Sequence, residues 1–215
     1  MIGGLRVKVC GLTTVEDAVA AAGIGADYLG FILHPKSPRY LPLERFVALR
    51  PRLPVLPQVA VMVAPTIHEV EAALGAGFDF LQIHFSDTDT EAVRVAAARA
   101  GAARLWLAPK LPPEAEVPAA ALELARTWLL DTYQASGFGG TGRTGDWAKF
   151  RRHREAHPEK CWVLAGGLSP ANIGDAVAAT GAELLDVNSG VEAAPGRKDP
   201  AKLAALRAAL ETRAC

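Results

Sequence analysis

The sequence predicts an α/β fold, a (βα)8 barrel in which residues 1–215 form a single catalytic domain. The main observation is a repeated phrase in which a glycine precedes a short apolar run. It occurs as "GADYLGFI" (25–32), "GFDFLQIH" (77–84), "GAARLWLA" (101–108) and "GAELLDVN" (181–188). Glycine in this place is typical of the left-handed residue after a helix, so each phrase marks a helix end followed by a strand. The phrases recur at multiples of roughly 24 to 27 residues, the size of a short βα unit. Eight such units fill the chain.

The strands of this barrel are expected in eight apolar runs. They lie near residues 5–10, 27–33, 55–63, 79–84, 103–108, 127–131, 161–165 and 183–188. Helical patterns alternate with these runs, which favours parallel strands covered by helices on the outside. A doubly wound open sheet is the second choice.

Several helix ends have recognisable signals. "TTVEDAVAAAGI" carries Glu16 three residues after Thr13, the spacing of a capping box, and "SPANIGDAVAAT" has Ser169 as its cap with Pro170 at the first helical position. The fifth unit contains four prolines in "PKLPPEAEVPAAALELA", so a long loop and a short helix are expected there. The last helix repeats leucine at helical spacing, at Leu203, Leu206 and Leu210.

The composition excludes several classes of function. The chain has 23 basic and 23 acidic residues, so no basic excess indicates a nucleic-acid or membrane partner. No stretch of 18 apolar residues and no signal-peptide core occurs, and a cytoplasmic location is expected. Three cysteines without C-x-x-C spacing indicate neither disulfides nor a zinc site. No metal or cofactor is expected.

The stretch "DTYQASGFGGTGRTGDW" (131–147) resembles two nucleotide-binding patterns. A dinucleotide fingerprint needs an acidic residue about 20 positions later, after the next strand, and that strand ends "VLAGGL". A phosphate loop needs its helix to begin at G-K-[ST], whereas here Arg143 stands for lysine and Gly145 precedes the helix. Both patterns are therefore rejected in favour of a glycine-rich loop after strand six.

Two further turns of small residues follow strands seven and eight, where a barrel commonly binds phosphate. They read "AGGLS" and "NSGVE". One such turn alone is more often only a tight turn, but three on adjacent loops favour phosphate binding. The expected phosphate-binding residues are Gly139, Gly140, Gly142, Gly166, Gly167, Ser189 and Gly190.

In this fold, catalytic residues lie at the carboxyl ends of the barrel strands. In this sequence, few side chains at those ends can transfer a proton near neutral pH. The residues at or near the ends of the eight runs are Cys10, His34, Ala64, His84, Ala108, Asp131, Ala165 and Asp186. Cys10 is the strongest candidate. For His84 a hydrogen-bonded barrel histidine and a site residue are equally favoured. The remaining histidines, at 68, 153 and 157, are expected on solvated helix surfaces.

The motifs together resemble those of the phosphoribosylanthranilate isomerase family over all eight units. The matching stretches are "VKVCGLTTVEDA", "GADYLGFIL" with "SPRY", "LQIH", "LLDT" with "GGTGRTGDW", "VLAGGLSPANI" and "LDVNSGVE" followed by "PGRKD". The resemblance implies a TIM barrel without metal or cofactor that performs an Amadori rearrangement in tryptophan biosynthesis. It also implies a small-molecule substrate, phosphoribosylanthranilate, and a monomer or homodimer.

The same resemblance implies roles for individual residues. Cys10 would be the general base, Asp131 the general acid and Arg39 the partner of the anthranilate carboxylate. From their places at strand ends, His84 and Asp186 are also expected to bind substrate. The base and acid roles require a lowered thiol pKa and a raised carboxyl pKa. A helix end, loop amides or a nearby base could lower the thiol pKa. Two departures from the family concern the pocket: Phe85 replaces the glycine of L-H-G, and "MVAP" replaces F-V-N after strand three.

Two other functions stay open at the level of the sequence. One is an isomerase acting on a different phosphorylated aminoaldose, which would share the phosphate turns. The other is a catalytically silent phosphate-binding module. A turnover assay separates these alternatives.

Overall fold

The computed structural model describes residues 1–86, 90–112, 114–131 and 146–212. The barrel strands are β1 (Arg6–Val9), β2 (Tyr28–Ile32), β3 (Gln58–Val63), β4 (Phe80–Phe85), β5 (Leu105–Pro109), β6 (Thr127–Leu130), β7 (Cys161–Leu164) and β8 (Leu184–Val187). The helices are α1 (Val15–Gly23), α2 (Leu43–Leu49), α3 (Ile67–Gly75), α4 (Thr90–Ala100), α5 (Ala119–Leu122), α6 (Trp147–Ala156), α7 (Ile173–Thr180) and α8 (Pro200–Glu211). Shorter elements are η1 (Arg50–Arg52), η3 (Ser189–Val191), β9 (Glu192–Ala194) and β10 (Arg197–Lys198).

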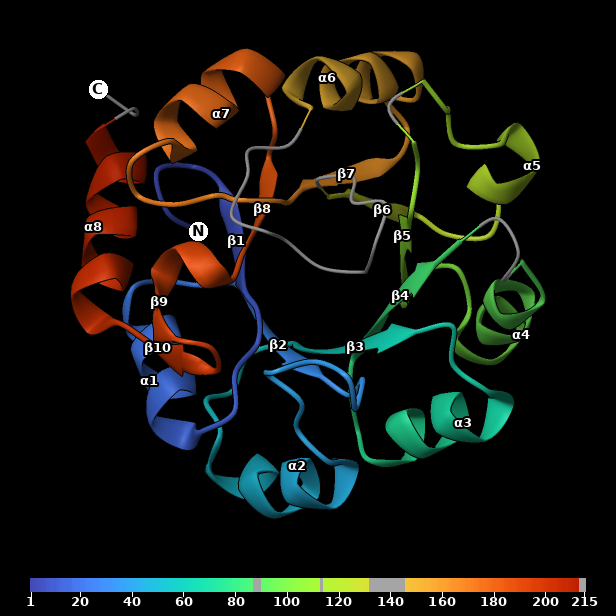
Figure 1. Ribbon diagram of the computed structural model, residues 1–215, viewed down its shortest axis with the longest axis horizontal. Helices are drawn as coiled ribbons and strands as arrows, with labels where there is room; N and C mark the ends of the chain where they lie inside the picture. The colour runs from blue at the N-terminus through green and yellow to red at the C-terminus, as the bar shows by residue number, and fades with distance from the viewer. Residues whose placement is uncertain (87–89, 113, 132–145, 213–215) are drawn as a thin grey trace.

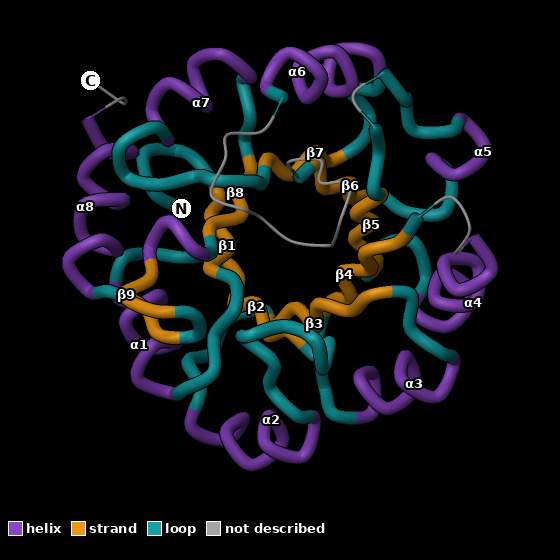
Figure 2. The backbone as a smooth tube through the Cα atoms, viewed as in Figure 1, coloured by secondary structure: helices purple, strands orange, loops and turns teal. Residues whose placement is uncertain are grey.

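The strands β1 to β8 pair in sequence order and close into a parallel barrel (Figure 2). Closure is made by β1 and β8, with Lys8 opposite Asp186 in the register. The helices surround the strands as an outer ring (Figure 1). The predicted (βα)8 barrel is thus confirmed, and an open doubly wound sheet is excluded by the β1–β8 pairing.

Alternation along the strands separates two apolar layers. In β1 the outward residues Val7 and Val9 are fully buried against the helices, while Arg6 and Lys8 share the inward face. The inward layer is a packed cluster rather than a pore. Its buried members are Val59, Trp106, Ala108, Leu129, Val163, Ala165 and Leu184.

The glycines of the repeated phrase do stand at helix ends in left-handed conformations. Their φ angles are 93° at Gly25, 92° at Gly77, 76° at Gly101 and 65° at Gly181. Gly181 is itself the C-cap of α7. The expected short fifth helix and the buried leucine face of the last helix are confirmed as well.

Two predicted helix starts are wrong. The cap of α1 is Thr14, whose side chain accepts from the Asp17 N–H, whereas the hydroxyl of Thr13 donates to the carbonyl of Gly196. Helix α7 has Asn172 at its N-cap position without a hydrogen bond from a capping side chain, and the segment 170–172 is a turn. In both places the backbone path of the loop decides which residue occupies the N-cap position.

Two other expectations fail because of packing. Strand β3 begins at Gln58 rather than near residue 55, since Val55 is fully exposed and Pro57 lacks an N–H for the ladder. His153 is only 2% exposed, so it is not solvated. Its Nδ1 lies 2.9 Å from the carbonyl of Lys149, and its ring lies 5.4 Å from that of Trp162.

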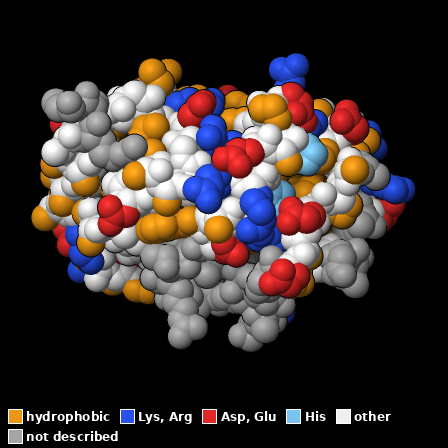
Figure 3. Space-filling view, turned by 90° about the horizontal axis from the view of Figure 1, so that it is seen from above, with side chains coloured by type: hydrophobic (Ala, Val, Ile, Leu, Met, Phe, Trp, Pro, Cys, Tyr) orange, Lys and Arg blue, Asp and Glu red, His pale blue; other side chains and the backbone are white. Residues whose placement is uncertain are grey.

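Charges of both signs are mixed over the face shown in Figure 3, with no large basic patch in the part of that face that is described. Among the described residues, no helix is long and apolar enough to cross a membrane.

Candidate active site

A cavity of about 740 Å³ opens where the barrel strands end. Its lining includes Cys10, His84, Asp131 and Asp186, four side chains that stand at the ends of different strands. Arg39, from the loop after β2, lines the same cavity. The structure therefore brings the expected proton-transfer groups and the expected carboxylate partner to one mouth. Their chemical roles are a separate question.

Lys8 forms a buried ion pair beneath this cavity. Its Nζ donates to Asp186 Oδ2 at 2.8 Å, and the lysine has no exposed surface. Burial works to lower the pKa of Lys8, but the Asp186 carboxylate outweighs it and raises the pKa, so the ammonium stays charged. In the part of the chain that is described, Asp186 Oδ1 is buried without a hydrogen-bond partner. That oxygen is an acceptor at the edge of the cavity.

The Cys10 thiol lies beside this ion pair and is 4% exposed. Gly30 makes room for both: a Cβ there would lie 3.0 Å from Cys10 Sγ and 2.8 Å from Lys8 Cε. Burial raises the pKa of the thiol, Lys8 and Lys198 act to lower it, and burial prevails. The surroundings of Cys10 therefore shift the thiol pKa in the direction opposite to the one that base catalysis requires. The counteracting charges are lysines rather than a helix end or loop amides.

His84 combines the two roles that were weighed for it. It lines the cavity, and its Nε2 lies 2.8 Å from Gln82 Nε2. Because an amide nitrogen only donates, this contact is a hydrogen bond when His84 Nε2 is the unprotonated ring nitrogen. Burial, with the charges of Lys8 and His34, lowers the His84 pKa to about 4. The imidazole is neutral at physiological pH.

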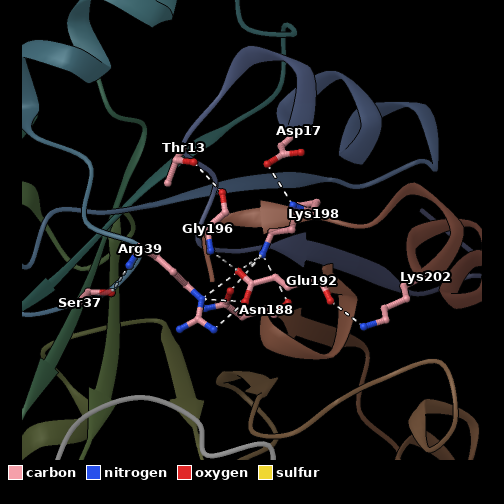
Figure 4. A network of polar contacts seen from close by, with 9 residues as sticks. All are labelled: Thr13, Asp17, Ser37, Arg39, Asn188, Glu192, Gly196, Lys198 and Lys202. Atoms are coloured by element: carbon pink, nitrogen blue, oxygen red, sulfur yellow. Dashed lines mark hydrogen bonds and ion pairs between the residues drawn. The ribbon is translucent and has the colours of Figure 1, made fainter. Parts of the chain in front are cut away.

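The guanidinium of Arg39 is held from one side by a carboxylate. Arg39 Nε lies 2.9 and 3.0 Å from the two oxygens of Glu192, and Nη2 lies 2.6 Å from Oε2 (Figure 4). Gly11 permits this approach, because a Cβ there would lie 2.7 Å from Arg39 Cδ. Arg39 is thus not a free surface residue.

The turns after β7 and β8 meet at the mouth of the same cavity. Gly166, Gly167 and Ser189 line the cavity, and the two glycines have φ angles of 91° and 62°. Within the described residues, the N–H groups of these three residues and of Gly190 have no acceptor. Asn172 Nδ2 binds the Gly167 carbonyl at 2.9 Å and so holds this acceptor in place. Consecutive unpaired N–H groups of this kind form an anion-binding nest.

The loop residues Gly139, Gly140 and Gly142 lie outside the described residues. Both departures from the family pattern are described. Phe85 packs outward into the layer between strands and helices, so it does not narrow the cavity. Ala64 has a φ of 40°, a left-handed conformation that asparagine tolerates better than alanine.

A family model described as N-(5'phosphoribosyl)anthranilate (PRA) isomerase matches residues 7–209. The chain belongs to this family. A curated member from Neisseria gonorrhoeae is 37% identical over 204 residues, 94% of each chain. The crystal structure of phosphoribosyl anthranilate isomerase from Thermotoga maritima is 31% identical with a TM-score of 0.82, covering 97% of this chain and 99% of that one. Another solved member is 29% identical with a TM-score of 0.77, covering 97% and 99%, and is in complex with reduced 1-(o-carboxyphenylamino)-1-deoxyribulose 5-phosphate.

Sequence reasoning missed three residues that the site depends on: Lys8, Glu192 and Lys198. Strand alternation predicts that Lys8 points into the barrel together with Cys10. Its ion pair with Asp186 across the β1–β8 closure cannot be predicted from the pattern. Glu192 and Lys198 fall within matching motifs, yet they come together only through the β9–β10 hairpin, which the sequence pattern did not reveal. In the described segments, no three His, Cys, Asp or Glu side chains form a group that could hold a metal ion.

Proposed function

We propose that the chain converts N-(5-phosphoribosyl)anthranilate to its 1-deoxyribulose isomer, with Cys10 as general base and Asp131 as general acid. The observation that carries this proposal is that both side chains line one cavity from the ends of strands that are not neighbours in the ring. Cys10 follows β1 and Asp131 follows β6, with β7 and β8 between them. A substrate in the cavity can therefore meet an acid and a base on different sides.

The rearrangement requires two proton transfers of this kind. Asp131 gives a proton to the ribose ring oxygen as the bond from that oxygen to carbon one breaks, which leaves a protonated imine between carbon one and the anthranilate nitrogen. Cys10 then removes the proton from carbon two, and the electron pair moves to form an enolamine. A proton returning to carbon one and loss of the proton from the oxygen on carbon two complete the ketose. No atom is gained or lost.

One neighbour of Cys10 supports its role as a base by opposing the burial that raises the pKa of the thiol. Lys8 is a fixed buried cation, and a negative charge that develops on the thiolate is stabilised by it without reorganisation. Asp186 Oδ1, which has no partner among the described residues, is placed to accept a hydrogen bond from a sugar hydroxyl. Neutral His84 binds substrate rather than supplying charge.

The two ends of the cavity match the two anionic groups of such a substrate. Arg39 would bind the carboxylate, and the amides near Gly166, Gly167 and Ser189 would bind the phosphate. The ligand of the solved relative carries both groups on one molecule, which supports this orientation. The sugar would then lie between them, next to Cys10 and Asp131.

The direct test is turnover of freshly prepared phosphoribosylanthranilate, followed by the loss of its fluorescence. The expected result is conversion that inorganic phosphate inhibits competitively. A folded chain that binds the compound without converting it would be a silent binding module. A chain that converts only another phosphorylated aminoaldose would be an isomerase of different specificity.

A further inference from the structure

The hairpin of β9 and β10 brings two buried charges to Arg39 (Figure 4). It lies between the start of α1 and the start of α8 and is anchored to both. The anchoring bonds run from Thr13 Oγ1 to the Gly196 carbonyl at 2.7 Å, from the Lys198 N–H to Asp17 Oδ2 at 3.1 Å, and from Lys202 Nζ to the Glu192 carbonyl at 2.6 Å. The hairpin is therefore a fixed support for the side chains it carries.

The carboxylate of Glu192 is fully engaged by donors. Besides Arg39, it accepts from Lys198 Nζ at 3.0 Å and from the Gly196 N–H at 3.1 Å. The Glu192 side chain is 4% exposed. Burial acts to raise its pKa, but the hydrogen bonds and charges of Arg39 and Lys198 outweigh burial and lower it. Glu192 is thus a permanent anion at neutral pH.

This contact divides the guanidinium of Arg39 into two edges. Glu192 binds the edge formed by Nε and Nη2 in the two-point geometry that arginine and carboxylate favour. The other edge, formed by Nη1 and the second N–H of Nη2, has no acceptor among the described residues. Because Arg39 lines the cavity, this edge is a preformed fork for a second carboxylate.

A lone Arg39–Glu192 pair would have no net charge and would attract an anion weakly. Lys198 changes the balance, because two cations and one anion leave a cluster with a charge of about +1. Lys198 is 3% exposed, and its Nζ also lies 3.0 Å from Asn188 Oδ1. Burial lowers the Lys198 pKa, and the Glu192 charge opposes this lowering.

We propose that Glu192 and Lys198 are positioning residues that set selectivity for a substrate with a carboxylate on its aromatic ring. Glu192 orients the open edge of the Arg39 guanidinium toward the cavity. Lys198 gives the cluster of Arg39, Glu192 and Lys198 a net positive charge. The inference rests on the proposed function, in which Arg39 binds that carboxylate. The competing explanation is that the three charges only hold the loops together.

The test compares two substrates: phosphoribosylanthranilate and phosphoribosylaniline, which lacks the ring carboxylate. The measured quantity is the ratio of their kcat/KM values. Lys198→Met should lower this ratio by about tenfold, mainly through KM for the carboxylate substrate, because the cluster loses its net positive charge. Glu192→Gln makes the cluster more cationic, but the loss of the two-point support of Arg39 should outweigh that gain and lower the ratio by a similar factor. Arg39→Met should lower the ratio most, and adding Glu192→Gln to it should change nothing further.

Lys202→Met is the matched control, since Lys202 anchors the hairpin without touching the guanidinium. The double variant Glu192→Gln/Lys198→Met removes an anion and a cation together, so it remains informative if a single variant fails to fold. A ratio equal to that of the parent in this folded double variant overturns the inference. A parent chain that turns over neither substrate refutes the proposed function instead.

Discussion

Two parts of the cavity mouth present different kinds of groups to an anion. The side near β1 and the β9–β10 hairpin uses side-chain charges, with Arg39 held by Glu192 and Lys198. The side near β7 and η3 uses backbone N–H groups of Gly167 and Ser189. Anion affinity on the charged side depends on neighbouring side chains and on their protonation. Each single substitution there should therefore remove part of that affinity. The backbone side depends on φ angles and is sensitive mainly to added charge or bulk.

Cys10 and Asp131 belong to neither of the two groups that would bind the anions, so their loss should affect the reaction and leave both anion sites intact. Cys10→Ala and Asp131→Asn should each lower kcat by on the order of 10² or more, with smaller changes in KM. Steady-state kinetics of folded variants measure this, and the parent should show a bell-shaped pH profile. A Cys10→Ala variant with the parent rate would require another base, with His84 the first candidate.

Phosphate binding by the backbone N–H groups is best tested by introducing a negative charge at a residue without a positive φ angle. Ser189→Asp should raise KM about tenfold or more, because a carboxylate repels the substrate phosphate at short range. Ser189→Asn is the neutral control of nearly the same size and should change KM little. The inhibition constant of inorganic phosphate should shift in parallel. Equal KM values for the two variants would separate Ser189 from phosphate binding.

The charges around Cys10 should shift its reactivity in opposite directions. Lys8→Met removes a cation and should slow alkylation of Cys10 by iodoacetamide, whereas Asp186→Asn removes an anion and should speed it. Each effect should be on the order of tenfold below the thiol pKa, which corresponds to about one pKa unit.

The alkylation rate is measured against pH in a Cys161→Ser/Cys215→Ser background, so that only Cys10 reacts. Because burial raises the pKa of this thiol, the rate should still be rising above the pH at which an ordinary cysteine is half ionised. Two variants that shift the profile in the same direction would contradict the electrostatic explanation.

The smallest expected effect concerns backbone conformation at another strand end. Ala64 has a φ of 40°, so Ala64→Gly or Ala64→Asn should stabilise the fold by roughly 0.5–1 kcal/mol. Urea denaturation with an unchanged m-value measures this difference. Ala60→Gly, in the middle of β3, is the control and should destabilise. A destabilised Ala64→Asn variant would show that the left-handed conformation carries no strain here.

Most of the architecture and the positions of the candidate groups were predictable from the sequence. Glycine before each apolar run marks a helix end, and strand alternation places Lys8 and Cys10 on one face, because both signals depend only on local backbone geometry. The carboxyl ends of parallel strands must meet, so Cys10, His84 and Asp131 could be expected at one mouth before any contact was known.

The tertiary structure alone decided how these groups are partnered. Lys8 meets Asp186 across 178 residues, and Arg39 meets Glu192 across 153, because barrel closure and a short hairpin bring them together. Burial in that closed interior then raises the pKa of Cys10, which no residue pattern encodes. Local signals report on near neighbours in the chain, whereas ion pairs and desolvation depend on which distant segments exclude water from the same space.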